Sequence, residues 1–217
     1  MENPKETECF KMIPEPSLRR LPIYYQYLKE QASLKKSEYI SCTQIANDLH
    51  LIPIQVRKDI EAVGISGKPK IGYNISSMIE DIESFLGWNN VSDAFLVGAG
   101  HLGQALLGYQ GFKDYGLNIV AAFDMDEKKI GNKIVNIKVV SIKKMSEMIK
   151  RMNIKIGIIT VPALFAQEIA DIMVNSGIKA IWNFAPAKIK VPSDIAVQHE
   201  NLASSLAVLS NKLRTRR

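Results

Sequence analysis

A glycine-rich loop, Gly98-Ala99-Gly100-His101-Leu102-Gly103, is the part of this 217-residue sequence whose residue types and spacing point most directly to ligand chemistry. The apolar residues 94–97 before it are typical of a buried strand, and the apolar segment after it is typical of a helix. Gly98 allows a tight turn, Gly100 lets a pyrophosphate approach the backbone, and Gly103 permits close packing of helix on strand. The free N–H groups of the helix would bind the phosphates. The loop therefore predicts a dinucleotide site.

Asp124 supports this prediction, because it stands at the end of the next expected strand, residues 117–123. A carboxylate at that position receives the adenosine ribose hydroxyls and repels a 2′-phosphate, which favours NAD over NADP. Asp126 adds to the negative field. Lys128 and Lys129 could soften the preference, although a solvated turn is the more common explanation for two such lysines.

The elements around the loop predict an α/β domain with a doubly wound, mainly parallel sheet. Further buried strands are expected at 154–161 and 178–184, with a helix at 163–175 between them. Strands that alternate with helices are typical of parallel sheets. Leucines at helical spacing predict a terminal amphipathic helix over 201–213, and Leu202, Leu206, Leu209 and Leu213 form its apolar stripe.

The segment before residue 87 predicts a helix-turn-helix domain. A first helix is expected to begin at Pro22, and a second begins after Ser41, whose position three residues before Gln44 fits a capping box. Pro53 begins a third helix that Gly64 ends; Asp59 is expected on its surface. The last helix of such a motif enters the major groove of DNA by its N-terminal end.

Residues 64–73 predict a wing, meaning a two-stranded ribbon beside the recognition helix, because they are rich in turn residues and lysine. A linker helix over 76–86 follows, and Gly87 ends it. Lys11 to Tyr73 carries ten basic and six acidic residues, an excess that suits a polyanionic partner. The expected DNA contacts are Ser41, Gln55, Arg57, Lys58, Lys68, Lys70 and Tyr73.

Composition excludes several classes of protein. No apolar run approaches the ~18 residues that span a bilayer, and the acidic N-terminal segment is no secretory signal, so we expect a cytoplasmic protein without membrane contact. The two cysteines are too few for a disulfide framework. Cys42 falls in the first turn of a predicted helix, where the dipole could lower its pKa, but a small packed residue is the simpler interpretation. No metal site is expected.

Taken together, these stretches resemble the Rex family of redox-sensing transcriptional repressors over roughly residues 18–213. The resemblance rests on Arg20-Leu21-Pro22 with Tyr24-Tyr25, Gln55-Val56-Arg57-Lys58-Asp59, Gly72-Tyr73, the glycine loop, Tyr109-Gln110-Gly111-Phe112, Ala121-Ala122-Phe123-Asp124, Thr160-Val161-Pro162, Gly177-Ile178-Lys179-Ala180 and Asn183-Phe184-Ala185-Pro186.

The resemblance implies a homodimer with winged-helix heads, NAD-binding Rossmann cores and C-terminal helices exchanged between subunits. NADH is then expected to rearrange the dimer and release operator DNA, whereas NAD+ competes without doing so. The implied domains are a disordered lead at 1–16, a winged-helix domain with linker helix at 17–87, a Rossmann domain at 88–200, and a dimerisation helix with a basic tail at 201–217. The implied cofactor contacts are Gly98, Ala99, Gly100, His101, Leu102, Gly103, Asp124, Thr160, Val161, Pro162, Phe184 and Pro186.

The sequence departs from the family pattern in two places. The wing has Lys68 and Lys70 where the family usually has an arginine, which keeps the charge but loses bidentate geometry. An arginine and an aspartate that link head and core through a tyrosine in known members correspond here to Gln26 and Asn201, with Tyr109 as the tyrosine. Gln26 and Asn201 can still form a hydrogen bond, but they are neutral and cannot form an ion pair.

Two alternatives stay open at this point. A DNA-binding regulator with a weak or lost NADH response would fit the neutral Gln26 and Asn201. A small NAD-dependent dehydrogenase is disfavoured, because about 115 residues follow the glycine loop, too few for a substrate domain. His101 could approach the pyrophosphate, although a solvent-facing loop histidine is the favoured interpretation. Trp182 is expected in the core.

Overall fold

The computed structural model describes residues 13–35 and 37–214, apart from the side chain of Leu202. The chain forms two compact units, one that ends at Asn89 and one that begins at Asn90. Most of the predicted disordered lead, residues 1–12, lies outside the described residues, as do residues 215–217 of the predicted basic tail. The end of the predicted lead is wrong, because Glu15 and Pro16 are already helical.

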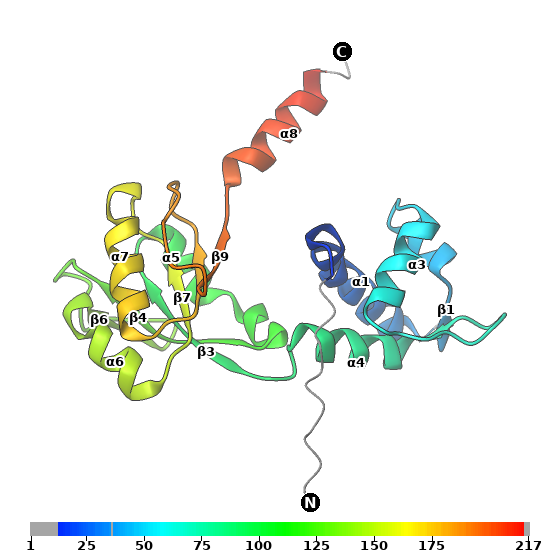
Figure 1. Cartoon of the computed structure of the whole chain (residues 1–217), viewed down its shortest axis with the longest axis horizontal. Coiled ribbons are helices and arrows are strands. Elements are labelled where there is room, and N and C mark those ends of the chain that lie inside the picture. The colour runs from blue at the N-terminus through cyan, green and yellow to red at the C-terminus, as the bar shows by residue number, and fades with distance from the viewer. Residues whose placement is uncertain (1–12, 36, 215–217) are drawn as a thin grey trace, which may run out of the picture. The chain divides into compact units, whose positions relative to one another are not determined.

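Over its described residues, the N-terminal unit consists of four helices and a small sheet (Figure 1). The helices are α1 (Glu15–Leu34), α2 (Cys42–Asp48), α3 (Pro53–Ala62) and α4 (Ile75–Leu86). α2 packs on α3 and α1 packs on α4. Their buried faces include Leu21, Leu28, Ile45, Ile60 and Ile82, none of which is exposed to solvent. The apolar spacing in the sequence therefore marks the true core of this unit.

The start of α1 differs from the sequence prediction. Pro22 lies in the middle of this helix, whereas we expected it in the first turn. Pro16 occupies the first turn instead, a position that suits proline because its missing N–H would have no partner there. Proline inside a helix costs one backbone hydrogen bond. Burial of Leu21, Tyr24 and Tyr25 around Pro22 offsets that cost, and sequence pattern alone does not show such burial.

The predicted helix-turn-helix and wing are both present. Ser41 caps α2 by accepting the Gln44 N–H at 3.1 Å, and Pro53 begins α3. Strand β2 (Tyr73–Asn74) pairs antiparallel with β1 (Tyr39–Ile40), which precedes α2. Between α3 and β2 the wing turns back on itself through a bridge of Lys68 with Gly72. The unit is therefore a winged helix.

The C-terminal unit contains a seven-stranded sheet in the order β5-β6-β4-β3-β7-β8-β9. Its strands are β3 (Ser92–Val97), β4 (Leu117–Asp124), β5 (Lys133–Ile134), β6 (Ile137–Ser141), β7 (Ile156–Ile159), β8 (Ala180–Asn183) and β9 (Ala196–His199). All neighbours pair in parallel except β5 with β6. With β5 set aside, the chain order across the sheet is 3-2-1-4-5-6, the dinucleotide-binding Rossmann arrangement.

Helices cover both faces of this sheet (Figure 1). Phe95 and Val97 of β3 face one core, with α6 (Met145–Met152) and α7 (Ala163–Ser176). Ala94 and Leu96 face the other core, with α5 (His101–Gly108). Successive residues of a strand point to opposite faces, so a strand buried on both sides reads as the continuous apolar run that the sequence has.

Several elements were not predicted, namely β5, β6, α6, β9 and the short 3-10 helices η1 (Gln110–Tyr115) and η2 (Ile142–Lys144). The β strands are two to five residues long, and such short segments carry little periodicity. The final helix, α8 (Leu202–Arg214), agrees with the prediction. Leu206, Leu209 and Leu213 of its stripe are each more than half exposed in the single chain.

Candidate functional site

The glycine loop connects β3 to α5 and has the geometry that a bound pyrophosphate requires. Gly98 has φ +103°, and a Cβ at this residue would lie 2.7 Å from the Thr160 carbonyl oxygen. A Cβ at Gly103 would lie 2.0 Å from the Gly98 carbonyl oxygen, so neither position accepts a side chain. A Cβ added at Gly100, by contrast, would meet nothing within 4 Å. The backbone there is open to a ligand, as the sequence predicts.

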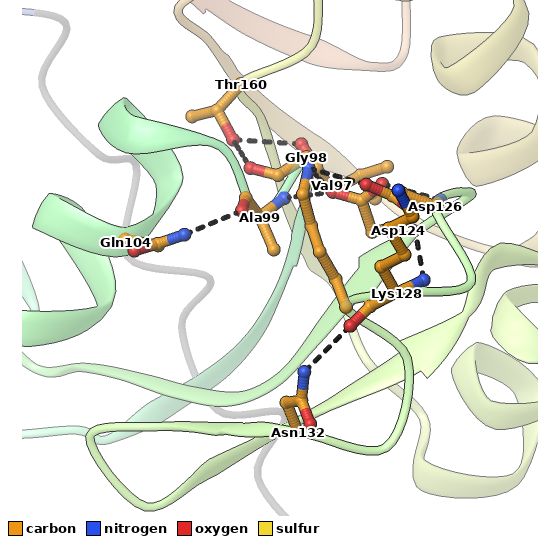
Figure 2. Close-up of polar contacts among 10 residues, drawn as sticks. Val97, Gly98, Ala99, Gln104, Asp124, Asp126, Lys128, Asn132 and Thr160 are labelled. Atoms are coloured by element: carbon orange, nitrogen blue, oxygen red, sulfur yellow. Dashed lines mark hydrogen bonds and ion pairs between the residues drawn. The ribbon is translucent and has the colours of Figure 1, made fainter.

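Polar side chains hold this loop in place (Figure 2). The Thr160 hydroxyl, at the end of β7, donates toward the carbonyl oxygens of Val97 and Gly98, 2.9 and 2.8 Å away. The Gln104 amide, in α5, donates to the Ala99 carbonyl at 3.1 Å. Side chains from two segments therefore hold the loop before any ligand binds, and a loop that is already ordered loses little conformational entropy on binding.

Asp124, the last residue of β4, is only 8% exposed and lies beside the loop (Figure 2). One carboxylate oxygen, Oδ2, accepts the Ala99 N–H at 2.9 Å, and the other, Oδ1, accepts the Asp126 N–H at 2.9 Å. Burial disfavours the charged form, but these hydrogen bonds and Lys129 outweigh burial and hold the pKa below its usual value. Asp124 is therefore an anion at neutral pH.

Lys129 forms an ion pair with Asp124, its Nζ lying 3.0 Å from Oδ2. The explanation of Lys129 as part of a solvated turn is therefore wrong. Exposed Lys128 contacts the turn through its backbone, donating its N–H to the Asp126 side chain and accepting from the Asn132 side-chain amide at 2.9 Å. The sequence places Lys129 five residues after Asp124 but cannot show that the side chain turns back toward it.

A cavity of about 300 Å³ opens beside the loop and Asp124. Its lining includes six of the predicted cofactor contacts, Gly98, Gly100, Asp124, Thr160, Val161 and Pro162. It also includes Lys129, which the sequence analysis considered as a residue that could soften the cofactor preference, and Met125, Ile142, Phe165 and Ile169, which it missed. They follow the carboxyl ends of β4, β6 and β7, the edge at which Rossmann domains bind ligands, so the strand ends were the signal that could have identified them.

The other predicted cofactor contacts lie outside the lining of this cavity. Ala99 and Gly103 are buried in the loop, and His101 and Leu102 are exposed in the first turn of α5. Phe184 packs on the ring of Trp182 with a centroid distance of 4.7 Å, and Pro186 is exposed. Their contact with a cofactor stays a prediction. Trp182 is half-buried, and its indole N–H donates to Glu200 at 3.0 Å.

Three of the predicted DNA contacts, Arg57, Lys68 and Tyr73, line one groove of the winged-helix unit. Arg57 and Lys58 are exposed on α3, while Gln55 is half-buried. A shallow groove runs between α3 and the wing, lined by Arg57, Lys68 and Tyr73 among others. Lys70 is exposed, and its φ of +65° places it in a left-handed turn of the wing. The Arg57 guanidinium pairs with exposed Glu61, with Nε 2.9 Å from Oε1.

Asp59 is not on the surface of α3, contrary to the sequence prediction, but 3% exposed. Its oxygens accept hydrogen bonds from Arg20 Nε at 2.6 Å, Arg20 Nη2 at 2.9 Å and the Tyr24 hydroxyl at 2.7 Å. Burial opposes ionisation, but these hydrogen bonds lower the pKa of Asp59 below its usual value. Arg20 and Tyr24 lie on α1, so these hydrogen bonds connect α3 to α1.

Cys42 begins α2 and is half-buried beside Tyr73. Burial raises its pKa, so the interpretation as a thiol activated by the helix dipole is wrong, and the interpretation as a packed residue fits. Burial, together with a hydrogen bond to Cys42, raises the pKa of Tyr73 to about 12. Both groups are neutral at pH 7.

The three predicted coupling residues lie in different elements. Gln26 is exposed on α1, and Tyr109 is exposed directly after α5. The Asn201 side chain accepts the N–H groups of Ala203 and Ser204 at 3.0 and 3.3 Å, so it caps α8. Their meeting across the units stays a prediction.

The described part of the chain can also be compared with what a metal site and a membrane-spanning helix require. Within residues 13–35 and 37–214 no group of three or more His, Cys, Asp or Glu side chains is arranged to hold a metal ion. No helix among those residues is long and apolar enough to span a bilayer.

A winged helix joined to a Rossmann domain defines the class of a DNA-binding regulator with a dinucleotide site. Residues 12–60 match the family model "Putative DNA-binding protein N-terminus", and residues 89–187 match the Rossmann-like model "CoA binding domain". A "Redox-sensing transcriptional repressor Rex" from Treponema denticola is 49% identical, over 95% of this chain and 98% of the relative. Another of that name, from Bacteroides thetaiotaomicron, is 42% identical over 98% and 96%. The chain belongs to the Rex family of redox-sensing transcriptional repressors.

Solved structures agree with this assignment. The chain is similar to the Rex-family repressor RSP in complex with beta-NAD+ and operator DNA, with a TM-score of 0.89 and 33% identity over 94% of each chain. It is also similar to RSP in complex with beta-NADH, with a TM-score of 0.86 and 32% identity over 94% and 96%. These likenesses identify a repressor and not an enzyme, so the dehydrogenase alternative is set aside.

Proposed function

We propose that this chain represses transcription as a homodimer on operator DNA and that NADH, bound in the C-terminal unit, releases it. The observation that carries the proposal is the pairing, in one chain of the Rex family, of a cationic winged helix with a glycine loop and buried Asp124. A protein with this function acts in the cytoplasm, where bacterial DNA is held.

In the proposed complex α3 enters the major groove and the wing contacts phosphate. Arg57 and Lys58 are the exposed cations of α3, and Lys68 and Lys70 are those of the wing. Tyr73 borders the groove between α3 and the wing, and half-buried Gln55 lies in the first turn of α3. Ser41, which caps α2, is proposed to contact the DNA backbone. Arg57 must leave Glu61 to reach a base, an exchange that costs little because both groups are exposed.

In the proposed cofactor site the cavity beside Asp124 accepts the adenosine half. The residues fit this group, since Asp124 is an ionised acceptor, Gly100 leaves space for the pyrophosphate, and Val161 and Phe165 provide apolar walls. The nicotinamide, which is positively charged in NAD+ and neutral in NADH, supplies the redox signal. Phe184 and Pro186, after β8, are proposed to border that ring.

Dimerisation is proposed to occur through α8. Leu206, Val208, Leu209 and Leu213 are all more than half exposed in the single chain. A helix that exposes a continuous apolar stripe usually buries it against a partner. A symmetric dimer would also present two recognition helices to a palindromic operator.

The decisive experiment is a titration of the full chain against a palindromic operator duplex of the family type, alone and with saturating NADH or NAD+. We expect tight binding alone and with NAD+, and weaker binding with NADH. A scrambled duplex is the control for non-specific affinity. Failure to prefer the operator would refute the proposed DNA function. Equal operator affinity in all three conditions would instead support a regulator that has lost its NADH response, which the neutral Gln26 and Asn201 make a real alternative.

A further inference from the structure

Asp124 has too few free acceptor sites for a ribose while Lys129 is bound to it. An ionised carboxylate offers about four lone-pair sites, two on each oxygen. Oδ2 accepts from the Ala99 N–H at 2.9 Å and from Lys129 Nζ at 3.0 Å, while Oδ1 accepts from the Asp126 N–H at 2.9 Å. One site is left, whereas the 2′- and 3′-hydroxyls of an adenosine ribose bring two donors.

The Lys129 ammonium is free to give way without movement of the backbone. Its own N–H donates to the Asp126 carbonyl at 3.0 Å, and the Lys128 N–H donates to the Asp126 side chain at 3.0 Å, so the turn is anchored. The side chain of Lys129 is 36% exposed and has a flexible four-carbon stem. Asp126 Oδ2 lies 4.0 Å from Nζ and is a second anion that the ammonium can turn toward.

The same ammonium lies where a 2′-phosphate would enter. Asp124 is buried and negative, so it repels that phosphate, and this repulsion is the basis for NADH selectivity. Lys129 lines the same cavity as Asp124 and carries the opposite charge. Lys129 therefore competes with the ribose hydroxyls of NADH for hydrogen bonds to Asp124. It also attracts the 2′-phosphate of NADPH, which Asp124 repels.

We propose that Lys129 is a selectivity-determining residue that narrows the discrimination between NADH and NADPH by pairing with Asp124. This inference rests on the proposed cofactor function and adds a determinant to it. Both effects of Lys129 act on the ratio of the two affinities in the same direction. Loss of the ammonium strengthens NADH binding and weakens NADPH binding.

The test measures dissociation constants of the full-length protein for NADH and NADPH by calorimetry, in the wild type and in Lys129→Met, which keeps the stem and removes the charge. We expect the ratio of the NADPH to the NADH dissociation constant to rise by about three- to tenfold, the size of one or two partly exposed charge interactions. Lys129→Gln serves as a second variant if the methionine variant does not fold.

Lys128→Met is the matched control, because it removes the same charge from the same turn while its backbone contact to Asp126 remains. Its ratio is expected to stay near the wild-type value. Adenosine 5′-monophosphate and adenosine 2′,5′-bisphosphate are the second pair of probes, because they carry only the adenosine end. Their ratio is expected to change in parallel with that of the dinucleotides.

The inference is overturned if Lys129→Met and Lys128→Met change the ratio equally, if the ratio falls, or if the dinucleotides respond and the adenosine fragments do not. A wild-type protein that binds no NADH would instead refute the proposed function. The two failures are therefore distinguishable.

Discussion

At the scale of single residues, two buried carboxylates organise the molecule in different ways. Asp124 receives two backbone N–H groups and one ammonium at the edge of a cavity, so part of its acceptor capacity can be given to a ligand. Asp59 receives an arginine and a tyrosine in the interior of its unit. Both have lowered pKa values, but the first is suited to binding and the second to holding a helix in place.

Replacement of Asp124 tests its part in binding. Asp124→Ala is expected to weaken NADH binding by about 1.5–3 kcal/mol, the usual value of hydrogen bonds to a charged group, and to weaken NADPH binding less. Calorimetry with both cofactors measures the change. Asp126→Ala is the control, and its effect should be smaller because Asp126 is exposed. Because the pKa of Asp124 is lowered, Asp124 should stay ionised from pH 8 to about pH 5, and its titration should not change NADH affinity over that range.

Replacement of Asp59 tests the interior ion pair. Asp59→Asn leaves Arg20 without its anionic partner, so the free energy of unfolding at pH 7 should fall by about 2–4 kcal/mol. The contribution of a carboxylate with a lowered pKa is present above its unfolded-state pKa of 3.8 and is lost as pH falls through the folded-state value. The difference between wild type and variant should therefore shrink below pH 3.8.

Trp88 fluorescence in a Trp182→Phe background reports on the N-terminal unit alone, since Trp88 packs edge-on against Tyr25 at 5.1 Å. Glu30→Gln, an exposed change on α1, is the matched control and should leave stability nearly unchanged. A stability difference for Asp59→Asn that does not depend on pH would argue against an ionised Asp59.

At the scale of elements, we propose that α3 and the wing contribute differently to DNA recognition. α3 presents Arg57 and Lys58 from a helix that is anchored through Asp59, so their side chains project from a fixed backbone. The wing presents Lys68 and Lys70 from a ribbon with a single bridge. A fixed helix suits base readout, and a point charge on a loosely held ribbon suits phosphate.

Arg57→Ala should therefore weaken operator binding by about 1–3 kcal/mol and relax sequence preference, as loss of a base contact does. Lys70→Ala should weaken binding to every sequence alike and reduce the salt dependence by about one counterion. Fluorescence anisotropy at several salt concentrations separates the two effects. Arg19→Ala, which removes an exposed cation from α1, is the control. If neither Arg57→Ala nor Lys70→Ala changes binding, DNA contacts another surface.

At the scale of the whole molecule, α8 and the coupling residues are proposed to link NADH binding by the C-terminal unit to DNA binding by the N-terminal unit. α8 is stabilised locally by its Asn201 cap, yet its apolar stripe is exposed in the single chain. A partner subunit would remove that apolar surface from water. We therefore propose that assembly and signalling depend on the same short segment of the chain.

Leu206→Glu should shift the dimer toward monomers, because it places a charge in the proposed apolar interface. Truncation after Gln198 should have the same or a larger effect. Sedimentation equilibrium measures the association constant. Ser204→Glu, an exposed position on the opposite face of the same helix, is the matched control and should remain dimeric. Dimers of normal affinity in the truncated chain would place the interface elsewhere.

The neutral Gln26 and Asn201 should leave NADH only weakly coupled to DNA release. A neutral amide pair stabilises one conformer less than a charge-assisted pair, by about 1 kcal/mol. NADH should then lower operator affinity by roughly a few-fold to tens-fold, because a ligand shifts an equilibrium only by its differential affinity. A double-mutant cycle with Gln26→Arg and Asn201→Asp, measured with and without NADH, tests the contact. Strict additivity of the two changes would show that these residues are not partners.

Much of the architecture was readable from the sequence because its signals are local. The glycine loop, the buried run before it and Asp124 after the next strand lie within 31 residues, and their spacing alone indicates a Rossmann site. Ser41 three residues before Gln44 and Pro53 at the start of a helix likewise depend on one turn of backbone. Such features follow from backbone geometry that is the same in every fold.

Tertiary structure decided the features that depend on partners distant in the chain or on the direction of a side chain. Asp59 reads as a surface residue of α3 until Arg20, 39 positions earlier, is folded against it. Pro22 reads as a helix start until the buried residues around it extend α1 through it. Lys129 reads as solvated until its flexible stem turns back to Asp124. In each case burial or pairing in three dimensions outweighs the local preference, and a single sequence does not record which residues will meet.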